Sequence, residues 1–399
     1  MPSRSFGAKG NRFAMRVLHV SAYFAPAFCY GGPPRSILGL CQSLRRNGVD
    51  SEVLTTTANG ADELPPGRRE YHGVPVEYVS RSFPRRFFNA AGMTARLDAL
   101  LPTFDLVHVH GLWNMTVWKS CAAAQRWKKP YVISPRGMLD RGSMKRKAVL
   151  KRLMLPAVER KNLTAAAMIH ATSTEEEEAI QRFQLPTPIR VVPNGVDLVK
   201  PDLEGGRELR QRLGIGENDP VAIYLGRIAP LKRLDLLAEV FQTVLMLLPA
   251  AKLIIAGPDE GGHLAKLRPK FEPLGDAVHF LGEVDFDQKR ALFAAANVLV
   301  CCSESESFGL SIAEALGAGV PAVVTETCPW SVLNEIGAGH WEPYSLGPAI
   351  IDVLTDLKRA RVMGEIGRRL IHERYSWERV GRSMIALYEE AMAVRRTAP

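Results

Sequence analysis

Short apolar segments alternate with longer amphipathic segments along nearly the whole chain. Residues 17–22, 106–111 and 252–257 each have the length and composition of a buried strand, and a turn and a helical pattern follow each of them. Parallel strands need a crossover connection, which is usually a helix, so this alternation predicts an α/β fold with parallel sheets rather than an α+β fold. A chain of 399 residues with 46% hydrophobic residues is long enough for two domains with a core each.

The predicted strands fall into two groups. The first group covers residues 17–22, 51–56, 76–80, 106–111, 131–135, 168–173 and 190–194, and the second covers 221–226, 252–257, 277–282, 297–302 and 321–325. Pro193–Asn194–Gly195 adds turn residues to the end of the first group, so we expect the hinge between the domains there. Residues 339–346 receive no assignment.

The stretch from residue 294 to residue 325 carries two carboxylates where a predicted strand passes into a helix that begins near Leu310. Glu306 and Glu314 bracket this junction, and Gly309 lets a ligand approach the backbone. The free N–H groups of residues 308–310 favour an anion, so the segment fits a ligand with phosphates and hydroxyls, such as a nucleotide sugar. The alternative is that Glu314 is a solvated helix residue and Gly309 only shapes a turn.

Arg227 and Lys232 follow another predicted strand. Arg227 lies at the carboxyl end of this strand, where open α/β sheets place ligands. Lys232 lies near the start of a helix predicted from Leu234 to Leu248, and a helix N-terminus disfavours a cation. The placement of Lys232 is easier to explain with an anion opposite, although a solvated surface pair is the alternative.

Gly31–Gly32 lies between the first predicted strand and a helix predicted from Ser36 to Arg46. A glycine pair suits a close approach of the backbone to a phosphate, but a plain turn explains it nearly as well.

His108 and His110 lie on the same side of a predicted strand, because side chains alternate along a strand. His110 precedes Gly111 at the strand end and can reach a crevice, whereas we interpret His108 as a packed core histidine. Two histidines at this spacing also suit a metal ion, but no third ligand lies nearby in the sequence, and we predict no metal site.

Taken together and in order, the motifs of this chain resemble those of the retaining glycosyltransferases of family 4, in the bacterial polysaccharide and glycolipid branch with the GT-B fold. The resemblance extends from residue 16 to about residue 392. Its segments include HVHGLW (108–113), SPRGML (134–139), ATSTEEEEAI (171–180), VVPNGVD (191–197), YLGRIAPLKRLDLL (224–237), the Glu306–Glu314 stretch, TCPW (327–330) and YSWERV (375–380).

The resemblance implies a GT-B architecture, in which two Rossmann-like parallel-sheet domains face each other across a cleft. Residues 1–193 are expected to form the acceptor-side domain and residues 194–375 the nucleotide-sugar-binding domain. Residues 376–399 are expected to form a helix that crosses back to the first domain.

The same resemblance implies roles for individual residues. Four would be catalytic: Arg227 and Lys232 contact the donor diphosphate, Glu306 holds hydroxyls of the donor sugar, and His110 lies beside the reacting sugar. The others would bind the donor: Glu314 binds the ribose, the backbone of Phe308, Gly309 and Leu310 cradles the distal phosphate and sugar, and Gly31 and Gly32 approach the diphosphate from the opposite domain.

The implied reaction moves a hexosyl group from a UDP-, GDP- or other nucleotide sugar to a saccharide or lipid-linked acceptor with retention of configuration, in exopolysaccharide, capsule or lipopolysaccharide biosynthesis. No carboxylate nucleophile is evident near His110, which favours front-face attack. Asp285–Phe286–Asp287 lacks the context of a metal-binding D-x-D motif, so we expect no metal requirement and no cofactor. The alternatives are a GT-B sugar-nucleotide epimerase and a binding-only homologue that would have lost Arg227, Lys232 or Glu306.

The net charge of +9 is concentrated in the first half of the chain, around residues 81–88 and 136–161. An anionic membrane surface and an acidic or pyrophosphate-bearing acceptor are candidate partners, and a solvated basic face is the alternative. No nucleic-acid module accompanies the charge, so we expect no nucleic-acid partner.

The six cysteines include no C-x-x-C pair, Met1–Asn11 lacks an apolar stretch, and no apolar run reaches the length of a membrane span. We therefore expect a cytoplasmic protein with reduced thiols, which binds reversibly at the inner face of the plasma membrane.

Overall fold

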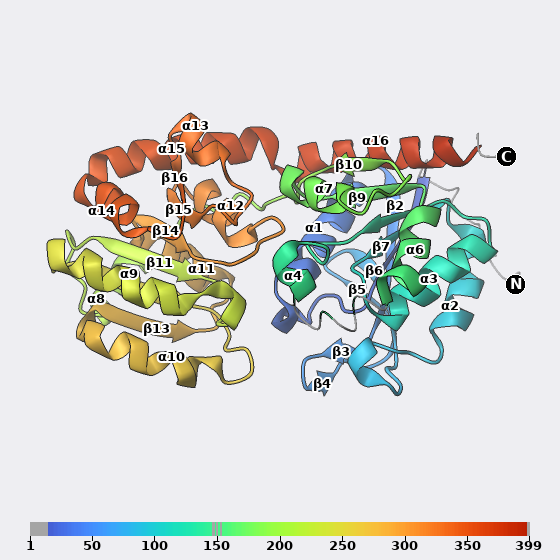
Figure 1. Ribbon diagram of the computed structural model, residues 1–399, viewed down its shortest axis with the longest axis horizontal. Coiled ribbons are helices and arrows are strands. Elements are labelled where there is room, and N and C mark those ends of the chain that lie inside the picture. Colours follow the sequence, from blue (N-terminus) through green and yellow to red (C-terminus); the bar gives the residue numbers. More distant parts are fainter. Residues whose placement is uncertain (1–14, 146–147, 149–150, 152–153, 397–399) are drawn as a thin grey trace, which may run out of the picture.

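The computed structural model describes residues 15–145, 148, 151 and 154–396. Two α/β domains stand side by side, and the chain passes between them twice (Figure 1). Each domain is built around its own largely parallel sheet with apolar cores on both faces. The predicted fold class, with two Rossmann-like domains facing across a cleft, is confirmed.

An eight-stranded sheet forms the centre of the first domain, with the strand order β10-β9-β8-β7-β1-β2-β6-β5. All its pairs are parallel except β5–β6. Its strands are β1 (Met15–Ser21), β2 (Val49–Thr56), β5 (Gly67–Tyr71), β6 (Val74–Val79), β7 (Leu106–His110), β8 (Tyr131–Ser134), β9 (Met168–Ala171) and β10 (Ile189–Val191). A separate hairpin pairs β3 (Ala58–Asn59) with β4 (Asp62–Glu63).

Helices cover both faces of this sheet, because neighbouring residues of each buried strand point to opposite sides. In β1, Val17 packs with α1 and α16, whereas Leu18 packs with α2, α3 and α6. The helices of this domain are α1 (Gly32–Arg46), α2 (Met93–Leu100), α3 (Met115–Arg126), α4 (Arg141–Lys145), α6 (Arg160–Ala165) and α7 (Thr174–Gln181), with a π-helical turn at Leu155–Glu159 and a 3-10 turn at Arg85–Phe87.

The second domain has a six-stranded, wholly parallel sheet with the order β13-β12-β11-β14-β15-β16. Its strands are β11 (Val221–Leu225), β12 (Lys252–Ala256), β13 (Val278–Gly282), β14 (Val298–Cys301), β15 (Ala322–Thr325) and β16 (Gly339–Glu342). Its helices are α8 (Leu203–Arg212), α9 (Leu234–Leu247), α10 (His263–Phe271), α11 (Phe286–Ala295), α12 (Leu310–Gly317), α13 (Val332–Ile336), α14 (Gly347–Thr355) and α15 (Leu357–Arg374), with 3-10 turns at Pro230–Lys232 and Glu272–Ala277.

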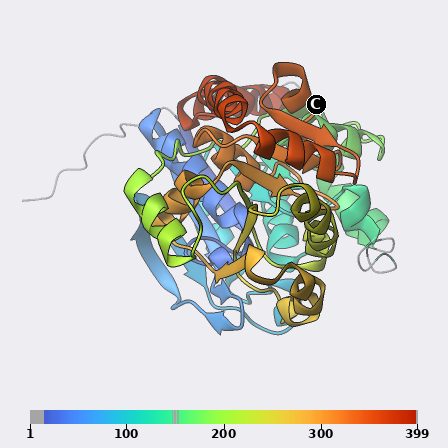
Figure 2. The same cartoon turned by 90° about the vertical axis from the view of Figure 1, so that its left-hand side faces the viewer.

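The last helix, α16 (Trp377–Arg396), packs against the first domain although it follows the second in sequence. Helices α15 and α16 run along the same edge of the molecule in both views (Figures 1 and 2). Trp377 sits where the chain crosses over: a side chain at Gly39 or Gly195 would come within 2.2 Å of its ring. These two positions therefore need glycine because the indole occupies the space beside them.

Three differences between the structure and the sequence predictions have a clear physical reason. Helix α1 begins at Gly32 rather than Ser36, because Pro33 and Pro34 are well suited to the first turn of a helix. Strand β5 was not predicted, because it is polar and pairs at the sheet edge. Strand β16, in the segment left unassigned, also lies at an edge and alternates only weakly. Within the described residues, no helix is long and apolar enough to span a membrane.

Candidate active site in the cleft between the domains

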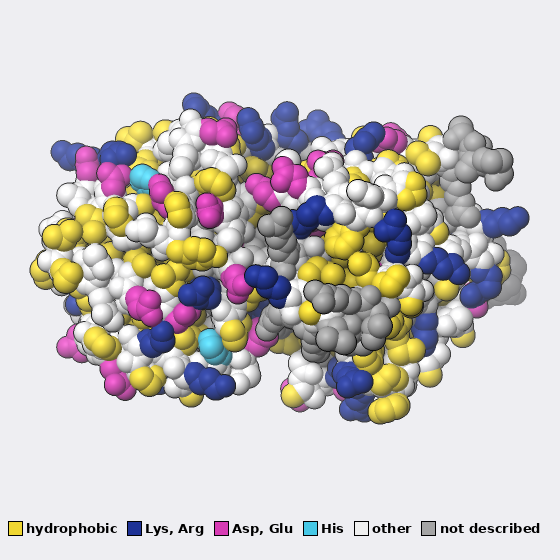
Figure 3. Space-filling view, in the orientation of Figure 1, with side chains coloured by type: hydrophobic (Ala, Val, Ile, Leu, Met, Phe, Trp, Pro, Cys, Tyr) yellow, Lys and Arg dark blue, Asp and Glu magenta, His cyan; other side chains and the backbone are white. Residues whose placement is uncertain are grey.

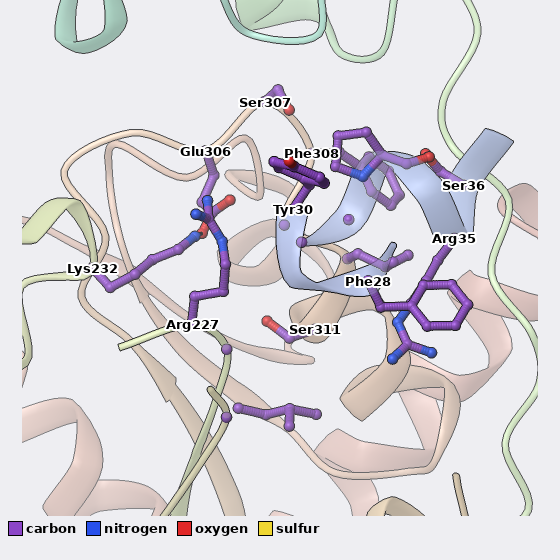
Figure 4. Close-up of a pocket in the computed structure, with 18 of the residues that line it drawn as sticks. Phe28, Tyr30, Arg35, Ser36, Arg227, Lys232, Glu306, Ser307, Phe308 and Ser311 are labelled. Atoms are coloured by element: carbon purple, nitrogen blue, oxygen red, sulfur yellow. Dashed lines mark hydrogen bonds and ion pairs between the residues drawn. The ribbon is translucent and has the colours of Figure 1, made fainter. Parts of the chain in front are cut away.

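A cavity of about 390 Å³ lies between the two domains. The carboxyl ends of β11 and β14 and the N-terminus of α12 form its second-domain wall, and the start of α1 and the loop after β8 form the opposite wall. Arg227, Lys232 and Glu306 group together on one side of it, across from Phe28 and Ser36 (Figure 4). Open α/β sheets bind ligands in such a crevice at the carboxyl ends of their strands.

Lys232 and Glu306 form an ion pair on the second-domain wall, and only 15% of each side chain is exposed. Burial lowers the pKa of Lys232, but the charge and hydrogen bond of Glu306, together with the nearby Cys301 thiol, raise the pKa above its usual value. Ser303 Oγ also donates to Glu306 Oε1, at 2.8 Å. No described residue donates to the second oxygen, Glu306 Oε2, so it is available to a hydroxyl of a ligand.

Glu314 is held in the same way from the neighbouring helix. Lys289 Nζ of α11 donates to Glu314 Oε1 at 2.7 Å, and both side chains are about seven-eighths buried. Among the described residues, none donates to Glu314 Oε2. The two carboxylates that bracket the loop are therefore both held by a lysine through one oxygen, and both residues line the cavity.

The loop between Glu306 and Glu314 leaves backbone N–H groups at the cavity. Gly309 is the N-cap of α12 with φ 77°, and the N–H groups of residues 308–311 donate to no described residue. Trp330 Nε1 donates to Phe308 O at 2.6 Å, and a side chain at Gly309 would meet Trp330 Nε1 at 3.1 Å and Ile312 Cδ1 at 2.7 Å. The indole thus holds the loop in a conformation that only glycine adopts readily, with a helix N-terminus open to an anion.

Arg227 links the second-domain wall to the first domain. Its guanidinium pairs with Glu260, and about a third of its side chain is exposed. Gly31, the N-cap of α1, has φ 86°, and a side chain there would come within 3.0 Å of Arg227 Nε. Gly32 next to it faces open space. The glycine pair is therefore the start of a helix directly across from the cation.

His110 does not line the cavity in this structure. It is 2% exposed at the end of β7, with Nε2 at 3.0 Å from His19 Nδ1 and Nδ1 at 3.1 Å from Arg136 Nη2. Arg136 lies at the cavity instead. The expectation that His110 itself faces the crevice is corrected. The end of β7 points toward the cleft, but the longer side chain of Arg136 covers His110.

His108 is fully buried, as predicted, and bonds to Tyr388 of α16 at 2.7 Å. The structure nevertheless supplies the third histidine that the local sequence lacked. His19, from the neighbouring strand β1, brings candidate ligand nitrogens of His19, His108 and His110 within 4.8 Å of one another. Arg136 donates to this cluster, and a guanidinium repels a metal cation. The prediction of no metal site stays a prediction.

The first-domain residues at the cavity that were not singled out from the sequence include Arg136 and Asp140. Both follow β8, Arg136 within the SPRGML segment and Asp140 directly after it. The signal was available, because β8 is a parallel strand whose carboxyl end must face the same cleft. In the sequence, Arg136 belongs to a basic segment, and Asp140 is a first-domain carboxyl group at the cavity. The expectation that no carboxylate nucleophile lies near His110 stays a prediction.

Asp140 and its neighbours contact the Glu306 loop across the cleft. Ser305 Oγ lies 3.4 Å from Asp140 Oδ2, and Thr172 Oγ1 donates to Ser307 O at 3.1 Å. Burial, reinforced by the nearby Glu176 carboxylate, raises the pKa of Asp140 to about 7. The cleft therefore contains a carboxyl group that changes charge near neutral pH.

Two family models match the chain and together span most of it. Residues 31–195 match the glycosyl transferase 4-like domain, and residues 206–370 match glycosyl transferases group 1. The chain belongs to the GT4-type glycosyltransferases.

Curated relatives align with this glycosyltransferase over nearly their full length. It is 27% identical to the D-inositol 3-phosphate glycosyltransferase of Xylanimonas cellulosilytica, covering 96% of this chain and 98% of that protein. It is 26% identical to the GDP-mannose:cellobiosyl-diphosphopolyprenol alpha-mannosyltransferase of Xanthomonas oryzae pv. oryzae, with the same coverage of both chains.

Solved structures support the fold of the glycosyltransferase. Sucrose-phosphate synthase from Thermosynechococcus elongatus superposes with a TM-score of 0.78 at 20% identity, over 95% of this chain and 99% of that one. Anabaena HepE in complex with UDP and glucose superposes with a TM-score of 0.74 at 19% identity, over 94% of this chain and 99% of that one.

The basic segments of the glycosyltransferase are less uniform than the sequence indicated. On the face shown in Figure 3, lysine and arginine side chains are spread among apolar ones over the first domain. Arg81 is paired with Glu63 at 2.7 Å, whereas Arg85 is 68% exposed and Phe83 is 90% exposed. Arg146, Lys147 and Arg152 of the second basic segment lie outside the described residues.

Proposed function

We propose that this glycosyltransferase moves a hexosyl group from a nucleotide sugar to a saccharide or lipid-linked acceptor with retention of configuration, in the synthesis of a cell-surface polysaccharide. One observation carries the proposal. The cavity combines two cations and an open helix N-terminus with two carboxylates that each present one oxygen without a hydrogen bond from a described residue. That combination suits a ligand with a diphosphate and two sets of hydroxyls.

The donor would lie along the second-domain wall. Its diphosphate would contact Arg227, Lys232 and the N-terminus of α12, because each favours negative charge. Glu306 Oε2 would accept from hydroxyls of the transferred sugar and Glu314 Oε2 from the ribose. Anabaena HepE, which shares the fold, was solved in complex with UDP and glucose, and this supports a nucleotide sugar as the donor.

Donor binding would change the ion pairs seen here. Lys232 is paired with Glu306 and Arg227 with Glu260, so a diphosphate would share or replace these carboxylate partners. Each cation would contribute about 4 kcal/mol of attraction at 4 Å and an effective dielectric near 20. Glu306 and Glu260 already attract these cations about as strongly. Only the difference between the attraction of the diphosphate and that of the carboxylate therefore favours donor binding.

In the proposed reaction, an acceptor hydroxyl attacks the anomeric carbon on the face from which the diphosphate departs. The carbon–oxygen bond to the leaving phosphate breaks, the bond to the acceptor oxygen forms, and the acceptor proton passes to a leaving phosphate oxygen. Arg227 and Lys232 would stabilise the negative charge that develops on the diphosphate. None of these steps calls on a metal ion or a cofactor.

Donor screening and product analysis test this proposal. Purified enzyme is screened with nucleotide sugars by thermal shift, since a donor at about 100 times its Kd stabilises by about 2.7 kcal/mol. The donor that binds is then incubated with EDTA-treated enzyme and membrane extract, and the anomeric configuration of the product is read by NMR. A sugar isomerised without acceptor would show the epimerase alternative, and binding with no turnover would show the binding-only one.

We also propose reversible contact of the first domain with an anionic membrane, where a lipid-linked acceptor would be presented. Phe83 and Arg85 support it, because an exposed aromatic side chain beside an exposed cation suits a lipid interface. Vesicle co-sedimentation of wild type and of the Phe83→Ser/Arg85→Glu variant is the test. Binding should need anionic lipid, weaken with salt and fall in the variant; equal binding to neutral lipid would contradict the proposal.

A further inference from the structure

Arg136 is a partly buried cation at the cavity, and its hydrogen-bond partners are all neutral. Nη1 donates to Ser36 Oγ at 3.0 Å and to Asn194 Oδ1 at 3.2 Å, and Nε and Nη2 lie 3.3 and 3.1 Å from His110 Nδ1. None of the ion pairs among the described residues includes Arg136. Among the other cavity cations, Arg227, Lys232 and Lys289 each pair with a carboxylate, and the Arg35 guanidinium stacks over the Phe28 ring.

The carboxylate that acts most strongly on Arg136 is already engaged elsewhere. Glu176 raises the pKa of Arg136, but burial is the larger cause and lowers the pKa to about 10. The Glu176 oxygens accept from Gly137 N at 2.6 Å and from Thr172 N at 2.7 Å. Arg136 therefore remains charged at neutral pH without a paired anion, and burying a charge in that state is costly.

The histidine that contacts Arg136 can only accept a hydrogen bond there. Every N–H of a guanidinium is a donor, so His110 Nδ1 is unprotonated and its Nε2–H donates to His19 Nδ1. His110 is neutral, because burial, helped by nearby positive groups, lowers its pKa well below the usual range. The contact thus orients Arg136 but does not neutralise it.

Two neighbouring histidines, His108 and His170, form a separate hydrogen-bonded chain with one consistent set of protons. His170 Nε2 must donate to Val192 O, which leaves His170 Nδ1 to accept from His108 Nε2. His108 Nδ1 then accepts from the Tyr388 hydroxyl at 2.7 Å. This network packs the floor below Arg136 with neutral rings and contains no carboxylate.

We propose that Arg136 binds a phosphoryl oxygen of a substrate in the cleft, and that His110 is a positioning residue that holds the guanidinium toward it. The inference rests on the proposed function, because it assumes that a substrate phosphate occupies this cavity. Three observations favour phosphate as the ligand. The start of α1 lines the same wall, Ser36 of α1 bonds to Arg136, and Arg227 and Lys232 face it from the other domain. Arginine also matches the geometry of phosphate oxygens.

Two substrates can supply that phosphate, the donor diphosphate and a phosphate-bearing acceptor. The full-length protein is compared with Arg136→Met, which removes the charge at similar length, with Arg136→Lys, which keeps the charge, and with the exposed control Arg126→Met, which breaks a surface pair with Asp98. Calorimetry measures UDP and GDP binding in one arm. Inorganic phosphate is titrated in the second arm, with and without saturating nucleotide, and circular dichroism verifies folding.

A loss of tenfold or more in nucleotide affinity in Arg136→Met, with Arg126→Met unchanged, assigns Arg136 to the donor diphosphate. Unchanged nucleotide affinity with loss of phosphate binding to the nucleotide-bound protein assigns it to an acceptor phosphate. Wild-type affinities in both arms for a folded Arg136→Met protein overturn the inference. If the wild type binds phosphate through Arg136 but no nucleotide, the proposed function fails and the inference stands; if it binds neither, both fail.

Two variants separate positioning from simple packing at His110. The His110→Asn amide can place an oxygen near the position of Nδ1 and accept from Arg136, whereas the His110→Gln amide reaches toward Nε2. We expect His110→Asn to retain much of the anion affinity and His110→Gln to lose as much as Arg136→Met. Equal affinities in both variants at equal thermal stability would overturn the positioning role.

Discussion

The two walls of the cleft differ in how their charged side chains are paired. On the second-domain wall, Lys232 pairs with Glu306 and Lys289 with Glu314, so the charges are balanced before a ligand arrives. On the first-domain wall, Arg136 has neutral partners, and Asp140 has a pKa of about 7. We call the second-domain wall the balanced wall, because its lysines can exchange their carboxylate partners for a ligand. The first-domain wall is the unbalanced wall, because a ligand or a proton can compensate its charge.

The cations of the balanced wall should give the largest effects. We expect Lys232→Ala and Arg227→Ala each to lower kcat by about a hundredfold to a thousandfold, because each removes charge stabilisation of the leaving group, as loss of one oxyanion donor does. Lys270→Ala, which breaks an exposed pair with Glu239, is the matched control. A near-native kcat in a folded Lys232→Ala enzyme would show that this wall takes no part in the chemical step.

The two carboxylates of the same wall should separate turnover from binding. Glu306→Gln should lower kcat about tenfold to a hundredfold, because its sugar contact would strengthen as the transition state forms. Glu314→Gln should mainly raise the donor KM, because a ribose contact is equal in the ground and transition states. Steady-state kinetics over a range of donor concentrations measures both. The opposite pattern would exchange the two roles.

Adjacent glycines test how closely the two walls approach each other. Gly31→Ala should destabilise the protein by about 1–3 kcal/mol, because φ is 86° and the new methyl group would lie 3.0 Å from Arg227 Nε. Gly32→Ala is the matched control, since a side chain there meets nothing within 4 Å. Thermal unfolding of both variants without ligand measures the difference. Equal melting temperatures would mean that the turn at Gly31 relaxes away from Arg227.

The smallest effect concerns protonation of the unbalanced wall. Burial and then the Glu176 charge raise the pKa of Asp140 to about 7, far above the value of about 3.9 in an unfolded chain. Between about pH 4 and 7, the folded state therefore keeps a proton on Asp140 that the unfolded chain has lost. The free energy of unfolding falls as the pH rises through that window. Asp140→Asn should raise the melting temperature relative to wild type more at pH 8 than at pH 5. Exposed Asp276→Asn is the control, and a pH-independent difference would contradict the assignment.

The elements that could be predicted from the sequence are those that are buried or that carry a clear local pattern. Strands such as β7 and β14 were found because they are apolar throughout, and the start of α12 was found because Gly309 and a polar loop mark it. Strand β5 carries only exposed or half-buried residues and pairs through its backbone at an edge, so its side chains hold no burial signal. Candidate residues on the second-domain wall were found because each follows a recognisable strand end.

The sequence alone determined the α/β class, most strands and the residues of the balanced wall, because hydrophobic periodicity and turn chemistry act over a few neighbouring positions. Tertiary structure decided which charges meet. Lys289 is 25 residues from Glu314, and Arg136 is 100 residues from Ser36, and no local pattern relates such pairs. The tertiary structure also decided that His110 lies beneath Arg136. Which side chain reaches the cavity at a strand end depends on how the side chains there pack against β1 and α16.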